Sequence, residues 1–308
     1  MKIKNIYLHN VKSVTDFTDD LTDRFSDEPL TSRVIDGRFN TGCTTILNFV
    51  YDLLTSLRSP RIRFHEVDED SMMSKESWCG ITVCFTDAEI EEQKRIWEEL
   101  RPFRETHWER TEHTPSFPTE ISIYHSSNEY LCSIGANDSF IMLSRWIHYA
   151  PPPFPTNVWD SVKEIVGPLG WNVEKIDMIG LANISTAISN QTKWYFTTSD
   201  NNQHLALVGS FNFMLDRVLR GYSLHPQHRR LSIDLPNGNT VDFSELSHTE
   251  RMLIHLINTL LLHQGPNTIF LIDNFDVGLR AKHAQAMWQA LVHIKCSQKI
   301  VTSVTDNF

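Results

Sequence analysis

The first feature of this sequence that can do chemistry is a loop bounded by two glycines, Gly37 and Gly42. The loop follows Arg33–Asp36, which is typical of a short strand, and precedes Thr44–Leu57, whose apolar residues recur on one side of a predicted helix. Strand, glycine loop and helix stand in the order that phosphate binding needs, because the free N–H groups at a helix N-terminus attract anions.

A second feature is a carboxylate at the end of an uninterrupted apolar run. The run Ile269–Ile272 is typical of a buried parallel strand, and it ends in Asp273 and Asn274. Such an ending is common by itself. It becomes informative because it follows, along the chain, both the glycine loop and a predicted helix that begins at Ser247.

Ser247 precedes the segment Thr249–Leu262, which has a wide apolar face, and Glu250 follows it three residues later. This spacing predicts a capping box, in which the two side chains accept hydrogen bonds from each other's backbone N–H groups. The helix is therefore expected to begin at Ser247.

Further elements are needed to position these features. Alternating or continuous apolar residues predict strands at Ile3–Val11, Gly80–Phe85, Glu120–Tyr124 and Ile300–Val301. Asn237 and Gly238 between Leu231–Leu235 and Thr240–Phe243 predict a hairpin. Helices are predicted at Asp87–Leu100, with Ile90 and Trp97 facing inward, and at Phe211–Arg220 and Arg280–His293.

The middle of the chain is less regular. Arg104–Pro118 is rich in polar residues and proline and predicts an exposed loop, and Pro151–Pro155 cannot be helical. The proline run is expected to mark the return from an inserted lobe. Tryptophans concentrate in this middle part, where both a core and a partner interface are open interpretations.

Composition limits the class of protein. The 308 residues are 41% hydrophobic, enough for one large α/β domain, and the formal net charge is −10. An acidic chain is a poor candidate for tight nonspecific DNA binding. No apolar run has transmembrane length, and the five cysteines are scattered without a CxxC pair, so we expect a cytoplasmic protein that does not bind membranes.

The start of the chain, Met1–Ser13, and the order of its later segments resemble the ATP-binding heads of SMC-, RecF- and OLD-like ABC-type ATPases. The resemblance covers roughly residues 1–55 and 230–308. It implies an α/β P-loop NTPase fold with a central, mostly parallel sheet, an antiparallel β lobe and a helical insertion. We expect a single domain over residues 1–308, with half-motifs at 1–57 and 230–308 and an inserted lobe at about 58–225.

Four positions depart from the patterns of that family. Lysine is replaced by Cys43, glycine by Thr249, glutamate by Asn274 and histidine by Val304. In the phosphate loop, G-x-x-x-x-G-K-S/T, the lysine contacts the β- and γ-phosphates, and a charge-assisted hydrogen bond of this kind is worth about 1.5–3 kcal/mol. The loop could bind ATP weakly or persist only for its shape. Cys43 could also be a reactive thiol, since a helix N-terminus lowers a thiol pKa.

The other departures affect the rest of the family's catalytic set. In the signature L-S-x-G-E/Q, Thr249 puts a branched side chain where the opposing subunit's nucleotide approaches. Asn274 stands where the general base is expected, and an amide cannot accept a proton at neutral pH. ATP hydrolysis is therefore expected to be impaired, so the chain is not expected to be an independent enzyme.

The resemblance assigns candidate site residues. Vestigial catalytic positions are Asp273, Asn274 and Val304. Candidate cofactor-binding residues are Gly37, Asn40, Thr41, Gly42, Cys43, Thr44, Thr45, Ser247 and Asp273. If ATP binds, Thr44 and Asp273 are the expected magnesium ligands.

The leading hypothesis is a degenerate pseudo-ATPase that acts as a scaffold or regulatory subunit. It would bind a protein partner or a second copy through the former nucleotide face, and a nuclease or an active ATPase is a candidate partner. Relatives of this shape imply work in DNA repair or anti-phage defence. The alternatives are an ATP-binding switch or slow ATPase with a rebuilt site, and a nucleic-acid-binding module that uses the basic stretch 217–230.

Overall fold

The structure, a computed structural model, describes residues 1–37, 42–58, 73–92, 94–95, 98, 119–126, 130–134, 172–183, 202–225 and 232–305. The chain divides into two compact units. The first consists of Met1–Arg33, Asn40–Val173 and Ser297–Lys299, and the second of Val34–Phe39, Glu174–Cys296 and Ile300–Phe308.

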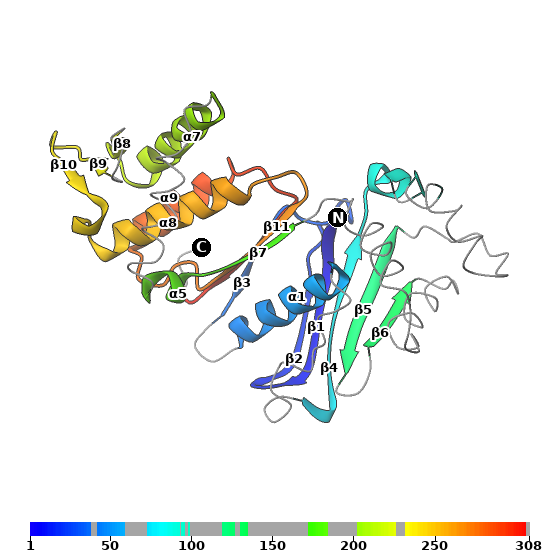
Figure 1. Cartoon of the computed structure of the whole chain (residues 1–308). Helices are drawn as coiled ribbons and strands as arrows, with labels where there is room; N and C mark the ends of the chain where they lie inside the picture. Colours follow the sequence, from blue (N-terminus) through cyan, green and yellow to red (C-terminus); the bar gives the residue numbers. More distant parts are fainter. Residues whose placement is uncertain are drawn as a thin grey trace, which may run out of the picture. The chain divides into compact units, whose positions relative to one another are not determined.

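The first unit contains a five-stranded antiparallel sheet in the order β2-β1-β4-β5-β6. Its strands are β1 (Lys2–Val11), β2 (Val14–Asp20), β4 (Met73–Cys84), β5 (Glu120–Ser126) and β6 (Tyr130–Ile134). Helix α1 (Cys43–Arg58) lies along β1 and β4 (Figure 1). Its buried side chains recur at the spacing of one helix face: Ile46, Leu47, Val50, Leu53 and Leu54.

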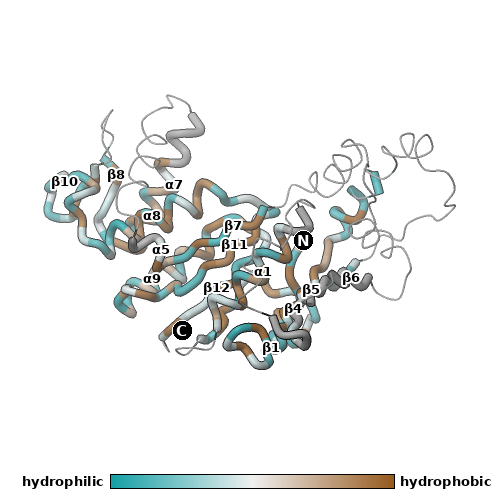
Figure 2. The backbone as a smooth tube through the Cα atoms, turned by 60° about the horizontal axis from the view of Figure 1, so that its bottom comes forward, coloured by the Kyte–Doolittle hydropathy of each residue, from teal (hydrophilic) through white to brown (hydrophobic). Residues whose placement is uncertain are grey.

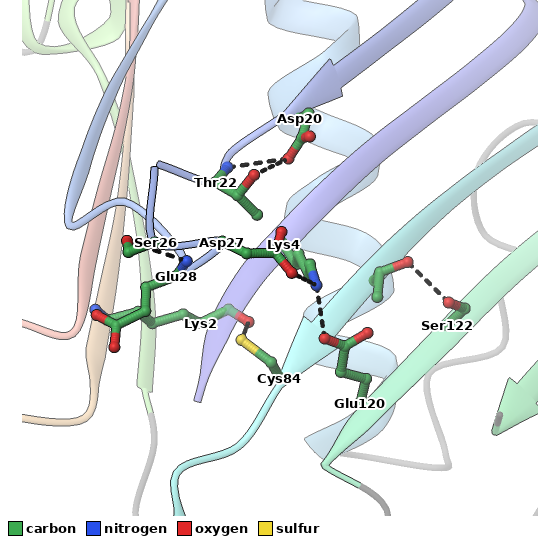
Figure 3. Close-up of polar contacts among 11 residues, drawn as sticks. Lys2, Lys4, Asp20, Thr22, Ser26, Asp27, Glu28, Cys84, Glu120 and Ser122 are labelled. Carbon is green, nitrogen blue, oxygen red and sulfur yellow. Dashed lines mark hydrogen bonds and ion pairs between the residues drawn. The ribbon is translucent and has the colours of Figure 1, made fainter. Parts of the chain in front are cut away.

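Lys4 on β1 connects this sheet to the turn that follows β2 (Figure 3). Its Nζ lies 2.8 Å from Glu120 Oε1 on β5 and 3.4 Å from Asp27 Oδ2. The hydrogen bond to Glu120, together with both negative charges, raises the pKa of Lys4. Cys84 Sγ on the intervening strand β4 lies 3.5 Å from Lys2 O.

The second unit holds the larger part of a four-stranded parallel sheet in the order β3-β12-β11-β7. Its strands are β3 (Ser32–Asp36), β7 (Asn172–Asp177), β11 (Thr268–Asp273) and β12 (Gln298–Ser303). Every residue of β11 and β12 is buried, which explains the uninterrupted apolar run in β11. Figure 2 shows the hydrophobic residues of β11 in brown.

Four described helices belong to the second unit: α5 (Met178–Asn183), α7 (Asn202–Val218), α8 (His248–His263) and α9 (Ala281–Leu291). Residues of α7, α8, α9 and β11 pack in one hydrophobic cluster, with Phe211, Leu253, Phe270 and Met287 among its fully enclosed members. α8 begins directly after a three-stranded antiparallel sheet, β10-β9-β8, and a short 3-10 turn, Phe243–Glu245. The packing of α8 within this hydrophobic cluster fixes the direction of the helix.

The three-stranded sheet consists of β8 (Ser223–His225), β9 (Ser232–Asp234) and β10 (Thr240–Asp242). β9 and β10 pair antiparallel, and the turn between them places Gly238 at φ 83°. Glycine adopts this left-handed conformation without a steric penalty. The predicted hairpin is therefore confirmed.

The predicted α/β class is confirmed, and the predicted strands and helices appear wherever the structure describes them. Local patterns missed β2, β6, β7, β8 and α5. Within the segment expected as an inserted lobe, β4, β5 and β6 join the same sheet as β1. Arg104–Pro118, Pro151–Pro155 and Trp97 lie outside the described residues. Among the described helices, none has the length and apolar character needed to cross a bilayer.

Candidate functional site

The carboxylate at the end of β11 is enclosed and has one free oxygen. Asp273 has no exposed surface, and its Oδ1 accepts a hydrogen bond from Thr302 Oγ1 at 2.7 Å. The same hydroxyl accepts from Asn274 N at 2.8 Å, so Thr302 connects the two residues. Asp273 Oδ2 is buried and has no hydrogen-bond partner among the described residues. Because a buried, unsatisfied carboxylate oxygen is costly, this position favours a cation or a donor from a ligand.

Asn274, at the position where the sequence resemblance led us to expect a general base, directly follows β11. Its φ of 55° lies in the left-handed region, where asparagine is among the few non-glycine residues commonly found. Its carbonyl oxygen accepts from Val277 N at 3.0 Å, which closes a turn directly after β11. The residue is buried, with 8% of its surface exposed. The backbone geometry suits asparagine, and the amide supplies no base.

The segment after β12 contains Val304 at the position expected for a histidine. Val304 N donates to Asp276 Oδ1 at 2.9 Å, and Thr305 N donates to Asp276 Oδ2 at 3.0 Å. Gly37 N, at the start of the glycine loop, donates to Ser303 O at 2.9 Å. Hydrogen bonds therefore join the residue after β3 to the end of β12, and the segment after β12 to the turn after β11.

The predicted capping box at the start of α8 is confirmed. Glu250 N donates to Ser247 Oγ at 3.4 Å, and Ser247 N donates to Glu250 Oε2 at 2.7 Å. Thr249 Oγ1 lies 3.4 Å from Gly278 O, so this side chain contacts the turn after β11. The N-terminus of α8 is therefore capped by hydrogen bonds and contacts within the second unit.

A tyrosine directly before β8 also donates a hydrogen bond to Glu250. Tyr222 Oη donates to Glu250 Oε1 at 2.5 Å. This hydrogen bond, with burial and the glutamate charge, raises the pKa of Tyr222 to about 12. Burial alone would raise the pKa of Glu250, but hydrogen bonds from Ser247 and Tyr222 outweigh it and lower that pKa. Glu250 is therefore a structural acceptor in this arrangement.

The second glycine of the loop is fixed by packing in the first unit. Gly42 has φ 78°, and a Cβ added there would lie 2.4 Å from Val14 Cγ2. Both constraints favour glycine. Cys43 begins α1 and is half-buried, Thr44 is exposed, and Thr45 is buried. Asn40 and Thr41 lie outside the described residues.

The structure thus brings part of the predicted set together. Asp273, Asn274 and Val304 lie on two connected segments of the second unit. Gly42, Cys43, Thr44 and Thr45 belong to the first unit. Sequence reasoning did not assign roles to Thr302, Asp276 and Thr305. The signal for the two threonines was a group of hydroxyl residues, Thr302, Ser303 and Thr305, directly after the apolar pair Ile300 and Val301.

The residues present fit magnesium in one respect. Magnesium in proteins is held by one or two carboxylates together with waters and substrate phosphates, and a lone Asp273 with a free oxygen meets that need. Within the described residues, no group of three or more His, Cys, Asp or Glu side chains could hold a metal by itself.

The basic stretch at 217–230 is described only in part. The Arg217 guanidinium carbon lies 4.4 Å from the ring centre of Phe213, and His225 Nδ1 lies 2.9 Å from Asp234 Oδ1. Residues 226–230 lie outside the described part of the chain. The two described basic groups named here therefore contact their own unit.

Comparison with known proteins places the fold. The chain is similar to the structure of an Smc head bound to the C-terminal winged-helix domain of ScpA, at 13% identity and a TM-score of 0.52 over 100% of this chain and 91% of that one. A second similar structure is an Smc head domain with an extended coiled coil, bound to the C-terminal domain of ScpA from Pyrococcus furiosus, at 10% identity, a TM-score of 0.47 and coverage of 99% and 90%. No protein-family model and no curated protein matches the chain. The fold is that of an ABC-type ATPase head of the SMC kind.

Proposed function

We propose that this chain is a non-hydrolysing ABC-type head that works as a scaffold or regulatory subunit. The observation that carries the proposal is Asn274, the amide that directly follows Asp273 at the end of β11. In heads of this fold the water that attacks ATP must lose a proton, and an amide does not accept one at neutral pH.

Two further features support the absence of turnover. Val304 provides no imidazole at the end of β12, and its backbone N–H is engaged by Asp276 at 2.9 Å. Cys43, at the first turn of α1, provides no ammonium group for the phosphates. Each change removes a different contribution to phosphoryl transfer, so a single reversion is not expected to restore it.

The partner in this proposal is a protein. The similar Smc head is itself bound to a protein domain, which supports protein binding as a use of this fold. For this chain a nuclease or an active ATPase, in DNA repair or anti-phage defence, is the partner class that we propose from the resemblance. The binding face would include the α8 N-terminus and the turn after β11, both of which are ordered by contacts within their own unit.

A second candidate function is an ATP-bound switch without turnover. The observation that favours it is Asp273 Oδ2, which is buried and without a partner among the described residues. Asp273 would contribute a carboxylate ligand to the magnesium ion, which would neutralise phosphate charge when bound. Under this candidate the chain binds ATP and changes its assembly, but it does not consume ATP.

The deciding experiment is a titration of the purified protein with ATP and magnesium, followed by calorimetric heat and by the thermal midpoint. The proposal predicts no phosphate release at millimolar ATP. Asp273→Asn is the test variant, and Asp216→Asn is the matched control, because Asp216 is exposed and accepts one backbone N–H from Gly221 at 2.7 Å.

Three outcomes separate the candidates. Absence of heat and of any midpoint shift supports the scaffold and directs attention to co-purifying proteins. Saturable heat that Asp273→Asn abolishes and Asp216→Asn retains, without phosphate release, supports the switch. Phosphate release that depends on Asp273 would overturn both candidates and identify a rebuilt ATPase.

A further inference from the structure

A buried carboxylate holds the backbone directly after the last strand. Asp276 is 2% exposed and lies in the turn that follows β11. Its Oδ1 accepts from Val304 N at 2.9 Å, and its Oδ2 accepts from Thr305 N at 3.0 Å. The Thr305 hydroxyl also donates to Oδ2, and Ser303 Oγ lies 2.8 Å from the same oxygen.

The backbone on both sides of this carboxylate is fixed as well. Phe275 N donates to Thr302 O at 2.9 Å, and Leu279 N donates to Asp276 O at 3.1 Å. On the opposite edge of the segment, Ser303 O accepts from Gly37 N at 2.9 Å. The segment 303–305 is therefore bonded on one side to the start of the glycine loop and on the other to the turn after β11.

We infer that Asp276 is a positioning residue that latches segment 303–305 in place without any ligand. Two backbone N–H groups and the Thr305 hydroxyl of this segment donate to its two carboxylate oxygens, and hydrogen bonds to a carboxylate are about twice as strong as neutral ones. Removal of the carboxylate would leave the N–H groups of Val304 and Thr305 without these acceptors. The segment would then open more often than the rest of the second unit.

The latch makes the position of segment 303–305 independent of nucleotide. The latch itself follows from the contacts of Asp276, whereas its use as a permanently formed binding face rests on the proposed function. Thr249 adds to this arrangement, because its hydroxyl lies 3.4 Å from Gly278 O in the turn that carries Asp276. One turn therefore connects the start of α8 to the end of β12.

The test is amide hydrogen exchange of the full chain, read by mass spectrometry on peptides that cover 298–308, without nucleotide. In the wild-type protein, the amides of Val304 and Thr305 should exchange much more slowly than in an unfolded peptide. Asp276→Asn should accelerate them about ten- to a hundredfold, because a hydrogen bond to a charged group is lost. Asp216→Asn is the matched control and should leave their exchange unchanged.

Thr305→Val keeps the proposal testable if Asp276→Asn does not fold. It removes one hydroxyl donor and keeps the backbone donor, so a roughly fivefold acceleration is expected. Exchange of the wild-type amides at the rate of an unfolded peptide would overturn the latch. So would unchanged exchange in a folded Asp276→Asn protein.

A second arm of the experiment adds ATP and magnesium. The latch predicts the same protection of Val304 and Thr305 with and without nucleotide. Protection that increases with ATP would overturn the nucleotide independence of this segment. Phosphate release with an unchanged exchange pattern would overturn the proposed function alone, so the two failures are distinguishable.

Discussion

Single residues in this chain decide which groups are available for hydrolysis and how stability depends on pH. Asn274 fits its left-handed backbone and removes a base, while Asp273 keeps a buried oxygen available. His255 lies on α8 with 4% of its surface exposed, and its ring packs edge-on against Phe243 at 5.5 Å. Burial lowers the pKa of His255 to about 4.

We predict that His255 makes the protein less stable in mild acid. Its pKa is 6.5 as a free side chain and about 4 in the folded protein, so only the unfolded state takes up the proton between these values. Its contribution is fully present above about pH 6.5 and is lost as the pH falls towards 4, with a total on the order of 3 kcal/mol. Denaturant unfolding at a series of pH values measures this.

The matched variants separate His255 from other acid effects. His255→Leu should flatten the pH dependence of the unfolding free energy between pH 4 and 6.5. His248→Gln, on the exposed first turn of the same helix, should retain it. If the unfolding free energies of the wild type and of His255→Leu changed in parallel with pH, His255 would not be the source of the pH dependence.

At the scale of elements, the turn after β11 is the part on which the site depends. It receives Thr249 from α8, bonds to Thr302 in β12, and carries Asp276 to the segment that follows. The orientation of α8 in turn depends on its N-terminal cap and on Tyr222, which holds Glu250 at 2.5 Å. Loss of the cap is therefore expected to weaken this whole arrangement.

Ser247→Ala should lower the free energy of unfolding by about 1 kcal/mol, because one backbone N–H at the α8 N-terminus loses its acceptor. Ser247→Asp is the control and should retain most of the stability, since aspartate is an equally good N-cap. Urea unfolding without nucleotide measures both variants. Equal midpoints for Ser247→Ala and the wild type would mean that water replaces the cap at no cost.

At the scale of the whole molecule, the protein is acidic, has two compact units, and has the fold of an SMC-type head at low sequence identity. The formal net charge of −10 opposes association with nucleic acid phosphates and is compatible with a basic protein surface. The fold alone does not assign a partner. The proposal of a protein partner therefore needs a test of assembly in its own right.

We predict that the sedimentation coefficient of the purified protein does not change when millimolar ATP and magnesium are added at physiological salt. The physical reason is that the phosphate loop lacks its lysine and the signature carries Thr249, so neither side of an ATP-bridged dimer is complete. Cys43→Lys with Thr249→Gly is the comparison variant. ATP-dependent dimerisation of the wild type would favour the switch over the scaffold.

Several elements around the candidate site were predictable because they depend on residues that are close in sequence. Local patterns predicted the strand that ends at Asp36, the helix that begins near Thr44, the buried strand that ends in Asp273, and the Ser247–Glu250 cap. Hydrophobic periodicity and capping act over three to eight residues, so they survive without knowledge of the tertiary structure. Strand β8 was missed although β9 and β10 are equally short, because the Asn237-Gly238 turn marks only β9 and β10 as a hairpin.

Other features were decided only by the tertiary structure. Thr302 and Asp273 are 29 residues apart, and Asp276 and Val304 are 28 apart, yet they bond because β11 and β12 are neighbours in one sheet. Gly42 needs the absence of a side chain because Val14, from a distant strand, approaches it. Strand order and close approach depend on the packing of the whole sheet, and local residue patterns do not encode them. The sequence alone determined which chemical groups the site has and lacks, and the fold decided which of them meet.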